Sequence, residues 1–170
     1  MLRPIPLALL AALCAGVLPA AAGGGASITQ TSVKGASLGQ TKAYYRARYG
    51  APGRLDRLQD GLERLAFPAL RIEIYFRPKQ SARAVGILTW SPNLKTVHGV
   101  GPCSTLAALK NAYGNRLPRV QFAGKIVAYR LGKLSFITEG RARVLVVQLS
   151  AKTKGGLDEF AGLNAPECGS

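Results

Sequence analysis

Two stretches of the chain decide its fold. Residues 35–50 read Gly-Ala-Ser-Leu-Gly-Gln-Thr-Lys-Ala-Tyr-Tyr-Arg-Ala-Arg-Tyr-Gly, and residues 99–114 read Gly-Val-Gly-Pro-Cys-Ser-Thr-Leu-Ala-Ala-Leu-Lys-Asn-Ala-Tyr-Gly. A constant offset of 64 residues aligns Thr41 with Thr105 and Tyr49-Gly50 with Tyr113-Gly114. Few residues are identical between the two stretches, but the physical pattern is shared, and it predicts the same supersecondary unit twice.

Each stretch predicts a two-turn helix. The hydroxyls of Thr41 and Thr105 can cap the helix N-termini, and Gly50 and Gly114 suit the left-handed position that ends a helix. Apolar side chains four residues apart give each helix one buried stripe, formed by Tyr45 and Tyr49 in the first and by Leu109 and Tyr113 in the second.

Antiparallel strands are expected after each helix. Residues 70–77 alternate, with Ile72, Ile74 and Phe76 on the core face. Further strands are predicted over residues 84–90, 125–131, 133–139 and 143–149, with hairpin turns at Gly132 and at Glu139-Gly140-Arg141. Residues 54–65 are ambiguous, since Asp60-Gly61 interrupts them, but the near-helical spacing of their leucines favours a short second helix.

The sequence therefore predicts an α+β fold of two tandem helix-plus-sheet repeats, residues 35–97 and 98–150, with the helices packed on the sheet. A hydrophobic fraction of 48% argues against general disorder.

The repeat resembles the small envelope-protein unit of the SmpA/OmlA lipoproteins and the β-lactamase-inhibitor-protein-like domains. Their motif, Gly-Met-Thr, a short helix and Gly-x-Pro, is matched here by Gly39-Gln40-Thr41 and Gly50-Ala51-Pro52. The second copy has Cys103 in place of the first glycine and lacks the proline. The resemblance implies a non-enzymatic binding or scaffolding module of the cell exterior. No inhibitory contact residue carries over, because no motif here matches one.

The two ends of the chain are predicted to lie outside these repeats. Residues 1–22 have a basic start, a short apolar run and a small-residue cleavage pattern, as expected for a secretory signal peptide. An uncleaved anchor is the alternative; no later segment is long and apolar enough to span a bilayer. Residues 23–34 are expected to be a flexible lead-in, with a short edge strand at its end as an option, and residues 151–170 a polar, glycine-rich tail.

Cys103 and Cys168 remain after signal cleavage. Outside the cytoplasm such a pair is expected to form a disulfide, which would tie the tail back to the start of the second helix. Closing a loop of roughly 65 residues stabilises by about 4 kcal/mol in the chain-entropy model. The alternative is Cys103 as a nucleophile beside His98.

A secreted hydrolase is the alternative from another functional class. Gly35-Ala36-Ser37-Leu38-Gly39 fits the Gly-x-Ser-x-Gly pattern, and Asp56 or Asp60 and then His98 follow in the hydrolase order. The segment before Ser37 is too polar for a buried central strand, however. The first glycine of the pattern recurs as Gly99 in the second stretch, where Gly101 replaces the serine. We therefore expect no enzyme activity. No metal-binding motif is present, and neither a metal nor a cofactor is expected.

The chain is strongly basic, with 23 Lys and Arg against 8 Asp and Glu and a net charge of +15. The excess is shared evenly, because residues 35–97 and residues 99–150 each carry a balance of +7. Two interpretations remain open. In the first, the many arginines reflect codon bias and are simply solvated. In the second, they attract an acidic protein or an anionic wall polymer and so attach the protein to the cell surface. Export disfavours nucleic acid as the partner.

Arg71, Tyr75, Arg77 and Trp90 are the candidate binding residues, because tyrosine and arginine are favoured at binding centres. The alternative is an ordinary half-exposed sheet face, covered by residues 55–65. The overall prediction is an exported, disulfide-linked binding or scaffolding module in the cell envelope or outside the cell. Its partner, its oligomeric state and the process it serves do not follow from the sequence.

Overall fold

The structure is a computed structural model that describes residues 27–58, 61–77, 82–121, 126–139, 142–151 and 168. The predicted signal peptide, and most of the predicted tail, lie outside these residues. The helices are α1 (Lys42–Tyr49), α2 (Leu106–Tyr113) and the short 3-10 helix η1 (Pro68–Leu70). The strands are β1 (Ser32–Val33), β2 (Ala36–Ser37), β3 (Arg54–Arg57), β4 (Glu63–Phe67), β5 (Ile72–Phe76), β6 (Ala84–Thr89), β7 (Arg119–Gln121), β8 (Ile126–Leu131), β9 (Leu134–Glu139) and β10 (Arg143–Ser150).

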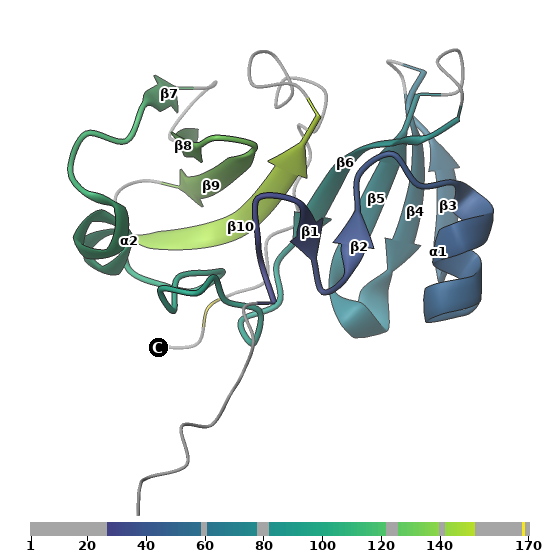
Figure 1. Cartoon of the computed structure of the whole chain (residues 1–170), viewed down its shortest axis with the longest axis horizontal. Coiled ribbons are helices and arrows are strands. Elements are labelled where there is room, and N and C mark those ends of the chain that lie inside the picture. The colour runs from purple at the N-terminus through teal and green to yellow at the C-terminus, as the bar shows by residue number, and fades with distance from the viewer. Residues whose placement is uncertain are drawn as a thin grey trace, which may run out of the picture.

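Eight strands form one antiparallel sheet in the order β3-β4-β5-β6-β10-β9-β8-β7. α1 is followed by the meander β3 to β6, and α2 by the meander β7 to β10 (Figure 1). The two meanders join where β6 pairs with β10, with Thr89 opposite Val147 and Gly86 opposite Ser150. The fold is thus α+β, as predicted: two helices, the eight-stranded sheet and the small β1–β2 sheet.

Both helices begin and end in the same way. The Thr41 hydroxyl accepts a hydrogen bond from the backbone N–H of Tyr44, and the Thr105 hydroxyl accepts one from Ala108. Gly50 and Gly114 close the helices with φ angles of 82° and 85°, which favour glycine. These local signals explain why two eight-residue helices form here.

The helix starts are bound to the sheet by matching backbone hydrogen bonds. In the first unit Gly39 N–H donates to Ala84, and Ala84 N–H donates to Gln40. In the second, Cys103 N–H donates to Val144, and Val144 N–H donates to Ser104. Gly39 and Cys103, 64 residues apart, also share a left-handed backbone, with φ angles of 80° and 67°.

The larger hydrophobic core lies between the helices and one face of the sheet. Tyr45 of α1 is fully buried and its ring lies 5.8 Å from that of Phe76, while Tyr113 of α2 lies 5.7 Å from Phe136. A second, smaller cluster lies on the opposite face of the sheet and contains Leu62, Tyr75, Leu88, Ala128, Ile137 and Val146. The sheet therefore has buried apolar side chains on both faces.

The N-terminal segment is not a flexible lead-in from Ser27 onward. Ile28 and Val33 are at most 1% exposed, because both apolar side chains enter the core. The Gln30 amide donates to the Leu131 carbonyl and accepts from the N–H of Lys133. The β1–β2 hairpin thus lies between α1 and α2 (Figure 1) and binds both parts of the sheet.

The helix expected within residues 54–65 is wrong, because the chain there forms strands β3 and β4. Gly61 has a φ of 79°, which ends any helical path at this point. After it the side chains alternate, with Leu65 in the larger core and Arg64 on the opposite face. The short edge strand β7 was also absent from the sequence prediction.

Candidate binding surface

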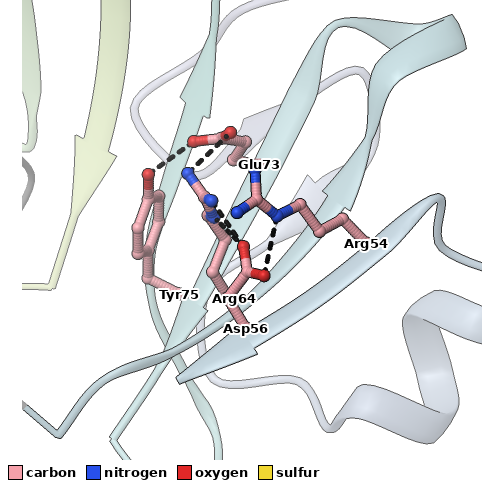
Figure 2. Close-up of polar contacts among 5 residues, drawn as sticks. All are labelled: Arg54, Asp56, Arg64, Glu73 and Tyr75. Carbon is pink, nitrogen blue, oxygen red and sulfur yellow. Dashed lines mark hydrogen bonds and ion pairs between the residues drawn. The ribbon is translucent and has the colours of Figure 1, made fainter. Parts of the chain in front are cut away.

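An ion-pair cluster lies on the β3–β5 part of the sheet, on the face opposite the helices. Cross-strand register places Asp56 opposite Arg64 and Arg64 opposite Tyr75, so these side chains meet on one face. Arg64 binds Asp56 through both Nε and Nη2, and its Nη1 donates to Glu73 at 3.2 Å. Arg54 Nε donates to Asp56 at 2.7 Å, and the Tyr75 hydroxyl donates to Glu73 at 2.5 Å (Figure 2).

A second set of ion pairs links α1 to the sheet edge. Glu63 accepts hydrogen bonds from Lys42 of α1 and, at 3.3 Å, from Arg57 of β3. The Lys42 hydrogen bond lowers the pKa of Glu63, as the Arg64 hydrogen bond lowers the pKa of Asp56. Both carboxylates are therefore held ionised by neighbouring cations.

The candidate binding face on β5 is not formed as the sequence predicted. Tyr75 is only 3% exposed and belongs to the second apolar cluster with Leu62 and Leu88. This burial raises the pKa of Tyr75, and Glu73 raises it further. Leu62 and Leu88, which are distant from Tyr75 in the sequence, pack in the same cluster. The alternation of residues along β5 alone therefore could not predict that Tyr75 is buried.

The other three predicted binding residues differ in exposure and surroundings. Arg71 is exposed, but it precedes β5 in a left-handed turn with a φ of 54°. Arg77 is half-buried, and Trp90 is half-buried against the second apolar cluster. The structure therefore leaves Arg71 as the exposed member of the predicted set.

The described carboxylates all form ion pairs, whereas many of the exposed cations do not. The carboxylates whose side chains the structure describes, Asp56, Glu63 and Glu73, all take part in ion pairs on β3–β5. Within the described ranges, a further group of exposed cations forms no ion pair: Lys34, Arg46, Arg48, Arg71, Arg83, Arg116, Arg119, Lys133 and Arg143. These cations are the candidate binding surface.

The residues of the hydrolase alternative have separate structural contacts. Ser37 lies in β2, where its carbonyl accepts a hydrogen bond from Tyr45 of α1. His98 is exposed in a turn, and its ring lies 5.2 Å from that of Tyr113 in α2. Asp56 is bound to Arg54 and Arg64. Each of these three side chains therefore has a different neighbourhood.

Cys103 forms the predicted disulfide with Cys168, with a Cα–Cα distance of 5.2 Å. The bond removes the Cys103 thiol that a nucleophile would require, and it is consistent with an extracytoplasmic location. It fixes Cys168 beside the start of β10, because Cys103 N–H donates to Val144. The predicted connection between the tail and the start of α2 is thus present at Cys168.

The residues that the structure describes contain no cluster of three or more His, Cys, Asp or Glu side chains suited to a metal ion. None of the helices formed by these residues has the length and hydropathy of a membrane-spanning segment.

Comparison with known proteins gives similarities of fold only. No family model and no curated protein matches the chain. An extracellular protein containing a SCP domain from Bacillus anthracis str. Ames is similar over 72% of this chain, with a TM-score of 0.49 and 10% identity, and the match spans 46% of that protein's length. A DUF4309 family protein (YjgB) from Bacillus subtilis subsp. subtilis str. 168 is similar over 74% of this chain and 86% of its own, with a TM-score of 0.48 and 20% identity.

Proposed function

We propose that this chain is an exported, non-enzymatic binding module that attaches to an anionic partner in the cell envelope or outside the cell. The observation that carries the proposal is the division of charge described above. Internal ion pairs use Asp56, Glu63 and Glu73, whereas the exposed cations named above, which lie on both units, form no ion pair among the described residues. Such a surface attracts a polyanion or an acidic protein.

The structural surroundings of the two candidate nucleophiles, Cys103 and Ser37, support a binding role without catalysis. The disulfide occupies Cys103. A nucleophile elbow holds its serine in a strained turn between a strand and a helix. Ser37 instead pairs with Ser32 in the β1–β2 hairpin, and its backbone φ angle is not positive. Lacking this geometry, Ser37 is better explained as a structural residue.

Duplication of one unit is the architectural part of the proposal. The matched caps, the matched hydrogen bonds at Gly39 and Cys103, and the two four-strand meanders support it. The same arrangement is what the resemblance to SmpA/OmlA and β-lactamase-inhibitor-protein-like domains implies. In those families such units bind or scaffold, which agrees with the role proposed here.

Salt elution of the mature protein from isolated cell envelopes tests this function. Bound protein should be released as NaCl rises to about 1 M, where the Debye length falls to about 3 Å. A variant with Arg116, Arg119 and Lys133 changed to Gln should elute at lower salt, since it loses three exposed cations. Retention at high salt, or identical elution of the variant, would contradict electrostatic attachment.

A further inference from the structure

The outward face of α1 carries an aromatic and cationic patch that the fold itself does not require. Tyr44 is 37% exposed, and Arg48, four residues later, is exposed on the same side of the helix. The Arg48 guanidinium lies 5.6 Å from the centre of the Tyr49 ring. The Tyr49 hydroxyl donates to the Lys34 carbonyl at 2.9 Å, which brings exposed Lys34 to the same end of the helix. We call Lys34, Tyr44 and Arg48 the α1 patch.

Arg48 is held in place rather than free in solvent. Besides its contact with Tyr49, its guanidinium lies against the backbone of Gly35, where a Cβ atom would collide with it. Its charge does not depend on these contacts, because an arginine side chain stays protonated at every pH at which the protein is folded. An ordered arginine loses less conformational entropy on binding a partner than a mobile one does.

The second unit supplies an internal comparison. At the offset of 64 residues, α2 has Ala108 in place of Tyr44 and Ala112 in place of Arg48, and His98 stands in place of Lys34. α2 nevertheless has the same length, cap and buried stripe as α1. Alanine is therefore compatible with such a helix at both positions, so the helix itself does not require the exposed tyrosine and arginine of α1, although the Tyr44 ring also packs edge to face on that of Tyr45 at 5.3 Å.

We propose that the α1 patch docks an acidic segment of another protein. This inference rests on the proposed function and names the partner class for one part of the cationic surface. Neither Lys34 nor Arg48 forms an ion pair among the described residues, because Asp56 and Glu73 pair with Arg64 and Glu63 pairs with Lys42 at the start of α1. A partner carboxylate can accept paired hydrogen bonds from Arg48, and Lys34 adds a second cation.

The tyrosine favours a protein over a simple charged polymer. A polymer of repeating anions binds through charge alone, so any exposed cation of the molecule would serve it equally. Tyr44 instead offers apolar ring area beside the arginine, and tyrosine and arginine are enriched where protein interfaces concentrate their binding energy. The patch therefore combines contacts for an apolar and an acidic side chain.

Titration of the mature protein with a synthetic peptide of repeated Glu-Leu-Asp-Glu units tests the proposal, with polyphosphate as the comparison probe. Tyr44→Ala and Arg48→Ala should each weaken peptide binding about tenfold. The matched controls are Val97→Ala, at an exposed apolar residue, and Arg116→Ala, at an exposed arginine of the α2–β7 connection. Val97→Ala should change peptide affinity less than about twofold. Arg116→Ala removes one charge of the candidate binding surface, so it should weaken peptide binding by about two- to threefold, clearly less than Arg48→Ala does. All four variants should unfold at the temperature of the parent.

The outcomes separate this inference from the proposed function. If Arg116→Ala weakens peptide binding as much as Arg48→Ala does, or Tyr44→Ala has no effect, the α1 patch is not the docking site, although attachment by charge would stand. If polyphosphate binds tighter than the peptide and its binding depends on every cation alike, the partner is a polyanion and not a protein. Absence of binding to both probes would overturn the proposed function as well.

Discussion

Arg64 is the residue on which the ion-pair cluster depends. Its side chain is 17% exposed and is the only described cation that contacts both Asp56 and Glu73. Arg64→Ala would leave two neighbouring carboxylates on one sheet face without their shared cation, so we expect a loss of about 1–3 kcal/mol in the free energy of unfolding. Urea unfolding measures this loss. Arg116→Ala, at an exposed arginine without an ion pair among the described residues, should change stability by less than about 0.5 kcal/mol.

The lowered pKa values of Asp56 and Glu63 predict a loss of stability in acid. Unfolded Asp and Glu titrate near about 3.9 and 4.3, above the folded values, so at low pH the unfolded chain binds more protons than the folded one. The stabilisation is complete above about pH 5 and is lost as the pH falls through the folded pKa values. The Asp56→Asn/Glu63→Gln double variant should therefore lose less stability than the parent between about pH 6 and pH 3. An unchanged pH profile would show that these pairs do not contribute.

At the scale of single elements, the two helix caps can be compared directly. Thr41→Ala and Thr105→Ala each remove the hydroxyl that accepts from the third residue beyond the cap, so each should cost about 1 kcal/mol. The Ser substitutions keep the hydroxyl and should be nearly neutral. Because the helices lie in separate units, the two costs should add in the double variant. Strongly unequal costs in chemical unfolding would argue against structural equivalence of the helices.

Local signals made the helices and most strands predictable, and non-local contacts explain the errors. Threonine caps and terminal glycines specify α1 and α2 within a few residues, and alternation specifies β5. The leucines of residues 54–65 have a spacing close to helical, but the pairing of β3 with β4 and of β4 with β5 places Leu55 and Leu65 in strands. Tyr75 alternates like an exposed residue, but Leu62 and Leu88 bury it.

The candidate binding residues were harder to predict because they depend on register and packing. The meeting of Asp56, Arg64 and Glu73 requires the pairing of three strands. The α1 patch did leave a signal, since Tyr44 and Arg48 are four residues apart on the side of the helix away from the buried stripe. The stripe of Tyr45 and Tyr49 predicts only which side of the helix faces the core, and the pattern assigns no role to the opposite side.

At the scale of the whole molecule, the disulfide joins the far end of the chain to the second unit. Cys168→Ser should lower the free energy of unfolding by about 2–4 kcal/mol, since the bond closes a long loop. Reductant should destabilise the parent by a similar amount and leave the variant unchanged. Equal stability of the oxidised and reduced parent would show that the bond adds nothing to the fold.

The claim that this cationic molecule binds an acidic protein is tested most directly by carbodiimide cross-linking of intact cell envelopes that contain it. The reagent joins a lysine amine to a carboxylate only where the two are in contact. We predict that Lys34, at the α1 patch, gives more cross-links to Asp or Glu residues of a second protein than Lys133 does, which is also exposed and lies at the β8–β9 turn. Cross-links distributed equally over both lysines, or none from Lys34, would contradict the account.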